Sequence, residues 1–119
     1  MTLVDAQLRY YRQSPRKVRL VADLIRGKTV ARAIAALTHL NKRAARPLLK
    51  LLNSAVANAQ HNFKLDPDTL VVRAITVDGG PVLKRWTPRA HGRATPIRER
   101  TSHVKLVLAP RRRTAAPQS

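Results

Sequence analysis

Hydrophobic and polar positions alternate at the start of the chain and change to helical spacing after Ser14. The alternating apolar positions are Val4, Ala6, Leu8 and Tyr10. This period of two is typical of a strand with one buried face. Ser14 precedes Pro15, so a residue able to cap free backbone donors stands before one suited to the first helical position. We therefore predict a strand, then a helix that begins after Ser14 and stops at Gly27.

Three helices are predicted before residue 62. The first carries Val18, Val21 and Ile25 on one face, and Arg16, Arg19 and Arg26 on the other side with Asp23. The second follows a plausible cap at Thr29. The third is predicted to begin near Asn41 or Lys42 and to end near Asn62. Pro47 either distorts its first turn or marks the start of the regular helix.

The second half of the chain predicts a long β-hairpin. Residues 70–77 (LVVRAITV) and 103–109 (HVKLVLA) have strand-like composition and spacing. Between them, residues 79–98 contain five Lys or Arg, three Pro, three Gly and no acid, a composition that a compact domain cannot bury. We call the segment of about residues 79–102 the arm. It is predicted to project on the order of 30 Å, if each side adds about ten residues at roughly 3.3 Å per residue.

These elements predict an α+β fold. A small three-stranded sheet, antiparallel or mixed, packs against three helices, and the arm protrudes from it. The strands at 70–77 and 103–109 must be antiparallel because one hairpin joins them, so parallel pairing is open only to the first strand. We assign residues 1–108, arm included, to a single domain and residues 109–119 to a basic, flexible tail.

The charge of the chain indicates a polyanionic partner. Lys and Arg total 24 against six acidic residues, which gives a formal charge of +18. Such a chain repels itself unless a partner supplies negative charge, and nucleic acid is the leading candidate. Basic residues recur throughout, with eight between Asp23 and Asp66 and no acid among them. Because only four residues are Phe, Trp or Tyr, stacking of successive bases is disfavoured, and recognition through phosphates and shape is predicted.

Enzymatic and metal chemistry is not predicted. The absence of cysteine excludes a disulfide framework, a thiolate zinc site and a cysteine nucleophile. The histidines His39, His61, His91 and His103 fall in different elements without ligand spacing. With a single Glu there is no acid–base pair, so we predict no enzyme and no cofactor. No apolar run approaches the roughly 20 residues that span a bilayer, and the start lacks a signal-peptide pattern, so a cytoplasmic location is expected.

Two basic motifs at the ends of the first helix have a functional and a structural interpretation. Ser14, Arg16 and Lys17 place cations at a helix N-terminus, an arrangement that either binds a phosphate or only caps the helix. Arg26 and Lys28 flank the helix end, where they either contact nucleic acid or stabilise the negative end of the helix dipole.

A third motif lies on the long helix. Ser54, Asn58 and His61 fall along one stripe beside several alanines. Small side chains let another backbone approach closely, and that neighbour is either the sheet or an RNA strand.

The arm carries the most concentrated candidate chemistry. Its cations are Lys84, Arg85, Arg89, Arg93 and Arg98. Arginine suits a nucleic-acid site because its planar fork binds phosphate through two donors and also stacks on bases. The structural alternative is a solvated loop. Trp86 either packs across the hairpin or inserts against a base.

Four motifs in this order resemble the family of bacterial large-ribosomal-subunit protein twenty-two. They are SPRKVRLVADLIRGK at 14–28, LLNSAVANAQHN at 51–62, KRWTPRAHGRA at 84–94 and RTSHV at 100–104. The similarity covers about residues 6–108. Two positions depart from the family pattern: His91 stands where an arginine is common, and Trp86 occupies a position that the family varies.

The resemblance implies a structural constituent of the large ribosomal subunit without catalytic activity. It implies a globular RNA-binding domain on the solvent side, bound to 23S ribosomal RNA and helping that RNA to assemble, and an arm that lines the nascent-peptide exit tunnel beside the macrolide site. The implied partners are this RNA, neighbouring large-subunit proteins and the nascent peptide, with one copy per ribosome, no homo-oligomer and no membrane.

Combining motifs and resemblance gives the candidate sites. The residues predicted to contact ribosomal RNA are Ser14, Arg16, Lys17, Arg19, Arg26, Lys28, Asn58, His61, Lys84, Arg85, Arg89, Arg93, Arg98, Arg100, Ser102 and His103. The residues predicted at the tunnel-facing tip are Trp86, Pro88, Arg89, Ala90, His91, Gly92, Arg93 and Ala94.

An architectural DNA-binding protein is the alternative, because paired β-arms with proline at their tips also enter a minor groove. Such a protein normally presents two arms from a dimer, and the chain shows no obvious self-complementary apolar surface. A membrane-active cationic peptide is disfavoured, since the helices bury their apolar faces in a domain-sized core.

Overall fold

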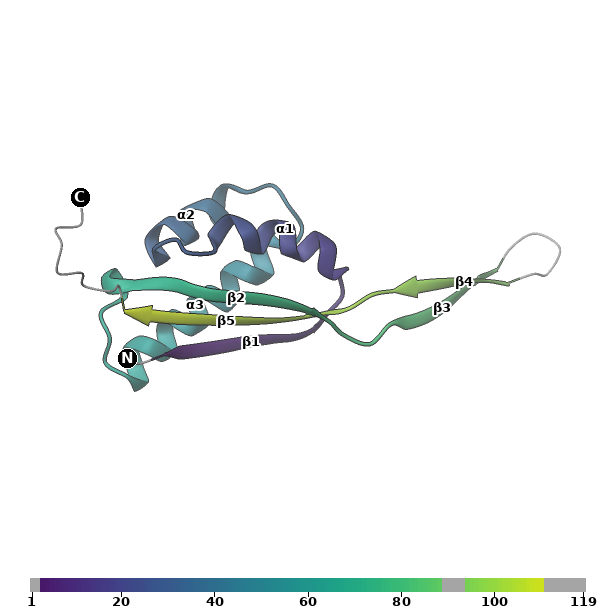
Figure 1. Ribbon diagram of the computed structural model, residues 1–119. Helices are drawn as coiled ribbons and strands as arrows, with labels where there is room; N and C mark the ends of the chain where they lie inside the picture. The colour runs from purple at the N-terminus through teal and green to yellow at the C-terminus, as the bar shows by residue number, and fades with distance from the viewer. Residues whose placement is uncertain (1–2, 89–93, 111–119) are drawn as a thin grey trace.

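The computed structural model describes residues 3–88 and 94–110 (Figure 1). The elements are β1 (Val4–Tyr11), α1 (Pro15–Ile25), α2 (Val30–His39), α3 (Ala45–Asn62), a 3-10 turn η1 (Pro67–Thr69), β2 (Leu70–Gly79), β3 (Leu83–Pro88), β4 (Ala94–Glu99) and β5 (Ser102–Pro110). The molecule is elongated, with extents of 70 × 27 × 20 Å. Its radius of gyration is 18.0 Å, against about 13.5 Å for a compact chain of this length.

The body is built on a three-stranded sheet in the order β1-β5-β2. Both strand pairs are antiparallel, so of the two predicted arrangements the fully antiparallel one is found, and the α+β prediction is confirmed. On β5, Val104, Leu106 and Leu108 are buried while Lys105 between them is exposed. The helices cover the apolar face (Figure 1), and the opposite face of the sheet stays open to solvent.

The end of β1 differs from the predicted alternation. A register shift lies between Leu8 and Tyr11, and Tyr10 takes a left-handed backbone with φ 57°. The extra residue in this bulge reverses the side-chain alternation. Tyr11 therefore packs against the core, and Tyr10, predicted on the buried face, is 62% exposed.

Helix α1 begins at Pro15 as predicted, with Ser14 at the N-cap position. The Ser14 side chain makes no cap hydrogen bond, so its predicted capping role is wrong. The helix ends before Gly27, whose φ of 79° is a conformation that glycine adopts without a steric penalty. The Gly27 N–H donates to the Val72 carbonyl at 3.0 Å, which ties the end of the helix to β2.

Helix α2 has the predicted cap, because the Thr29 side chain accepts from the Arg32 N–H at 3.3 Å. Helix α3 starts at Ala45, later than predicted, and so places Pro47 in the first turn, where the missing N–H costs no helical hydrogen bond. Ala55 and Ala59 are fully buried. These small side chains of α3 therefore serve packing inside the body.

The arm leaves the end of the sheet as a second antiparallel pair, β3 with β4 (Figure 1). Pairing of β2 with β5 ends at Gly79 opposite Ser102, and pairing of β3 with β4 starts at Leu83 opposite Glu99. The register changes by one residue between these pairs, so the arm continues the hairpin with a break at its base. The predicted projection of the arm from the body is confirmed for the described part.

Candidate nucleic-acid interface

Buried hydroxyl groups hold the base of the arm, which we define as residues 79–81 and 100–102. Ser102 is fully buried, and its Oγ donates to the Gln13 carbonyl at 2.6 Å. Thr101 is 3% exposed, and its Oγ1 donates to the Pro81 carbonyl at 2.6 Å. The Gly80 N–H donates to the Thr101 carbonyl at 2.9 Å. These contacts fix the direction in which the arm leaves the sheet.

Beside the base of the arm lies an open pocket of about 650 Å³, which we call the cationic pocket. It is lined by Ser14, Pro15, Arg16, Lys17, Arg19, Gly79 and Arg100. Its lining, drawn from the described residues, has four cations and no acid. The N-terminus of α1 opens into the same pocket, and the positive end of the helix dipole adds to the positive potential. The arrangement suits phosphate groups.

The fold determines the position of Arg19. Its Nε and Nη2 donate to the Val77 carbonyl at 3.1 and 2.9 Å, while the residue itself stays exposed. Since one backbone carbonyl holds the guanidinium, the remaining donors keep a defined direction at the pocket wall. Arg19 therefore joins α1 to β2 and also lines the predicted binding surface.

The contacts of Arg26 fit a structural role at the end of α1 better than a contact with nucleic acid. Its Nη2 donates to the Ile75 carbonyl at 2.8 Å, and its Nη1 pairs with the Asp23 carboxylate. Lys28 is exposed, and its carbonyl accepts from the Val72 N–H at 2.8 Å. Neither residue lines the cationic pocket.

The stripe on α3 is separate from the cationic pocket. Ser54 and His61 are exposed, and Asn58 is half-buried and accepts a hydrogen bond from Asn62. The last turn of α3 lies at the end of the sheet opposite to the arm (Figure 1). The structure therefore does not bring His61 together with Arg16 and Lys17.

Two predicted contacts of β5 have roles inside the fold. Ser102 is fully buried and its hydroxyl donates to the Gln13 carbonyl, so the structure assigns it a packing role, and its predicted RNA contact stays a prediction. His103 is half-buried, and its Nδ1 accepts from the Tyr10 N–H at 3.2 Å. Its Nε2 lies next to Gly80, so His103 connects the bulge in β1 to the base of the arm.

The backbone of the arm places its predicted contacts in register. Lys84 is opposite Arg98, Arg85 opposite Ile97, and Trp86 opposite Pro96. Pro88 pairs with Ala94 at the last described position before the tip. The predicted tip residues Arg89, Ala90, His91, Gly92 and Arg93 lie outside the described residues.

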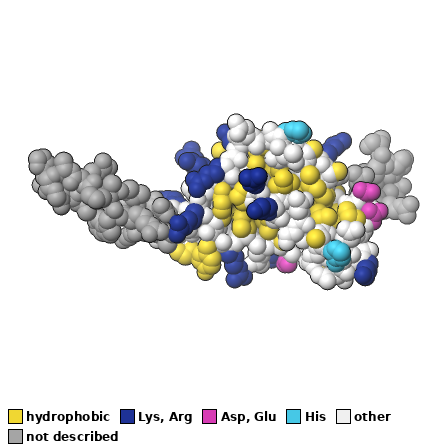
Figure 2. Space-filling model, turned by 180° about the vertical axis from the view of Figure 1, so that it is seen from behind, with side chains coloured by type: hydrophobic (Ala, Val, Ile, Leu, Met, Phe, Trp, Pro, Cys, Tyr) yellow, Lys and Arg dark blue, Asp and Glu magenta, His cyan; other side chains and the backbone are white. Residues whose placement is uncertain are grey.

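On the face drawn in Figure 2, Lys and Arg side chains are denser on the half of the body near the arm, and a few lie at the far end. Acidic side chains lie mostly at the far end of that face. The hydroxyl contacts at the base of the arm could not be found from the sequence, because Thr101 and Ser102 resemble ordinary surface residues there.

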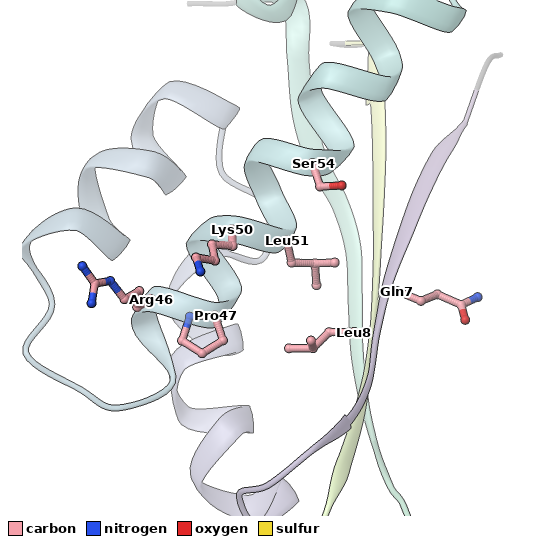
Figure 3. A pocket seen from close by; sticks show the side chains of 7 residues that line it. All are labelled: Gln7, Leu8, Arg46, Pro47, Lys50, Leu51 and Ser54. Carbon is pink, nitrogen blue, oxygen red and sulfur yellow. The ribbon is translucent and has the colours of Figure 1, made fainter.

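A second hollow has a different character (Figure 3). It is a groove of about 400 Å³ between β1 and the start of α3, lined by Gln7, Leu8, Arg46, Pro47, Lys50, Leu51 and Ser54. Leu8 and Leu51 point toward each other across it, while the Gln7 side chain points away. The groove is mainly apolar, with Arg46 and Lys50 beside it, and holds no ionisable pair suited to catalysis.

Two other kinds of site are absent from the part of the chain that the structure describes. Among the side chains that the structure describes, no group of three or more His, Cys, Asp or Glu could hold a metal ion. Within residues 3–88 and 94–110, no helix is long and apolar enough to cross a membrane.

Comparison with known proteins gives one consistent match. The family model described as "Ribosomal protein L22p/L17e" matches residues 6–109. A "Large ribosomal subunit protein uL22" from Mesoplasma florum is 59% identical over 107 residues, 90% of this chain and 96% of that protein. A protein of the same name from Desulfitobacterium hafniense is 56% identical over 91% of this chain and 95% of its own length. Another from Bdellovibrio bacteriovorus is 54% identical over 88% of this chain and 96% of its own length. The chain therefore belongs to the ribosomal protein L22p/L17e family.

Proposed function

We propose that this protein is a structural constituent of the large ribosomal subunit that binds 23S ribosomal RNA. The observation that carries the proposal is the cationic pocket, where Arg16, Lys17, Arg19 and Arg100 meet the N-terminus of α1 at the base of the arm. Family membership and the names of the relatives support the same assignment. Residues 1–108 are then one RNA-binding domain that includes the arm.

The mechanism is electrostatic clamping at separated points. The cationic pocket neutralises phosphates of one RNA segment, and the arm cations neutralise phosphates of another. Each contact releases condensed counterions, and the rigid base of the arm holds the two segments in one geometry. In this way the protein helps the RNA to assemble: it stabilises one RNA conformation and catalyses no reaction.

The arm supplies the second part of the proposal, which is that it lines the nascent-peptide exit tunnel. Its length and basic composition fit a narrow RNA-walled passage, since a strand pair exposes both faces to phosphates. The partners are 23S ribosomal RNA, neighbouring large-subunit proteins and the nascent peptide. One copy acts in each ribosome, in the cytoplasm, without homo-oligomer, cofactor or catalysis.

The test measures binding to 23S ribosomal RNA fragments and to duplex DNA of equal length across a salt series. The wild-type protein is compared with Arg16→Gln/Lys17→Gln. We expect RNA to bind more tightly at every salt concentration. The salt slope is the steepness with which the logarithm of the binding constant falls with the logarithm of the salt concentration. We expect the double variant to lower this slope by about two, because each lost phosphate contact removes about one unit.

A matched control removes the same charge elsewhere. Arg46→Gln/Lys50→Gln takes two cations from the apolar groove and should leave the salt slope close to wild type. Equal salt slopes for both double variants would mean that RNA binding depends on the total charge of the protein and not on the cationic pocket. Equal affinity for DNA and RNA would favour an architectural DNA-binding protein instead.

A further inference from the structure

Tyr10 combines strong exposure with an unfavourable backbone. Its side chain is 62% exposed, and its φ of 57° lies in the left-handed region. A bulky aromatic residue rarely adopts this conformation, in which Asn or Gly is less strained. The side chain contributes little to the core, so neither burial nor backbone preference explains a tyrosine here.

The fold nevertheless holds Tyr10 in a defined position. The bulge in β1 turns the side chain out of the core, and the Tyr10 N–H donates to His103 Nδ1 at 3.2 Å. The two rings meet edge to face, with centroids 4.8 Å apart and planes at 84°. A T-shaped contact uses at most one face of the tyrosine ring. Because Tyr10 is 62% exposed, much of its ring surface is accessible to a planar ligand.

Beside His103, the ring partner of Tyr10, lies a hollow that Tyr10 itself does not line. This hollow of about 160 Å³ on the open face of the sheet is lined by Gln7, Arg9, Asp78, His103, Val104 and Lys105. Arg9 and Lys105 are exposed cations that can meet phosphate, and Arg12 is exposed two residues beyond Tyr10. The Arg9 Nε donates to Gln7 Oε1 at 3.0 Å, which holds the guanidinium at the rim of the hollow.

We propose that Tyr10 is a stacking platform for one unpaired RNA base, with Arg9 and Lys105 meeting the phosphates that flank it. The proposal rests on the proposed RNA-binding function and deepens it by naming a single-stranded nucleotide as the ligand of this surface. Every base presents a π-face, so stacking on one aromatic ring requires no particular sequence. The three cations Arg9, Arg12 and Lys105 outnumber the one acid, Asp78, at this surface, and this balance favours RNA over an uncharged or basic protein segment.

The experiment separates stacking from charge. Tyr10→Asn removes the ring and suits the left-handed backbone, so the variant should unfold no earlier in denaturant than Tyr10→Ala. Its affinity for transcribed 23S ribosomal RNA should fall about 5- to 150-fold with an unchanged salt slope, because no phosphate contact is lost. Tyr10→Phe keeps the platform and should stay within about two-fold of wild type.

The outcomes distinguish this proposal from the general function. Wild-type affinity for Tyr10→Asn would overturn the stacking site, even if RNA binding and its dependence on Arg16 and Lys17 stand. Loss of all RNA preference in the wild-type protein would instead overturn the proposed function. A direct readout is ultraviolet crosslinking of the wild-type protein to 23S ribosomal RNA: a nucleotide adduct on Tyr10 supports the site, and adducts confined to other residues contradict it.

Discussion

Gly80 lies where two strands separate into the arm, and the space around it has room only for hydrogen. A Cβ built on Gly80 would lie 2.5 Å from Thr101 Oγ1 and 3.0 Å from His103 Nε2. Thr101 cannot move away freely, since it is buried and donates to the Pro81 carbonyl. At Gly79, by contrast, a Cβ would meet only Pro15 Cγ at 3.8 Å, an ordinary contact.

Gly80→Ala should therefore lower the free energy of unfolding by about 1–3 kcal/mol, the cost of overpacking a filled site. Gly79→Ala is the matched control and should change it by less than about 0.5 kcal/mol. Denaturant titration of both variants measures the difference. Equal stability of the two would mean that the base of the arm relaxes without cost.

Ser102 gives a second prediction at the same scale. Ser102→Ala leaves the Gln13 carbonyl without the hydrogen bond that it accepts at 2.6 Å, and should cost about 1–3 kcal/mol of unfolding free energy. The salt slope of RNA binding should not change, because the buried hydroxyl meets no phosphate. A lowered slope with intact stability would support Ser102 as an RNA contact.

At the scale of elements, α1 shows what the sequence can and cannot predict. The Ser-Pro start, the glycine stop and the Val18, Val21, Ile25 face were all predictable, because they depend on local spacing. The bulge at Tyr10 and the start of α3 at Ala45 were not, because strand register and burial of Ala44 and Ala45 are decided by distant contacts.

Two neighbouring residues of α1 test the predicted buried face of this helix. Ile25 is fully buried, whereas Leu24 is 44% exposed. Ile25→Ala should destabilise the protein by about 2–5 kcal/mol through lost burial and a residual cavity. Leu24→Ala should stay within about 0.5 kcal/mol of wild type. Thermal unfolding of the two variants checks the contrast, and a large effect of Leu24→Ala would indicate that the exposed side also packs.

At the scale of the whole molecule, the arm was predictable from composition, since its cations, prolines and glycines suit no buried element. The cationic pocket was predictable only in part. Arg16 and Lys17 were grouped with Ser14 by the motif, but Arg100 joins them through the hairpin, and sequence spacing does not reveal that approach.

The separate pairing of β3 with β4 predicts that the body folds without them. Replacing residues 83–99 by Asn-Gly, a favoured two-residue turn, should leave unfolding cooperative with a midpoint within a few degrees of wild type. The salt slope of RNA binding should fall by up to about five, one for each of Lys84, Arg85, Arg89, Arg93 and Arg98. Loss of the cooperative transition would show that the arm is part of the folding unit.

The arginines that join α1 to β2 also cover an edge of the sheet. β2 is an edge strand, and an exposed edge is a template on which further chains pair and aggregate. Arg19 and Arg26 occupy the outer carbonyls of Val77 and Ile75, and Gly27 occupies that of Val72. A second copy finds these acceptors already bonded and two guanidiniums in its way. These contacts disfavour the addition of a strand from another copy along β2.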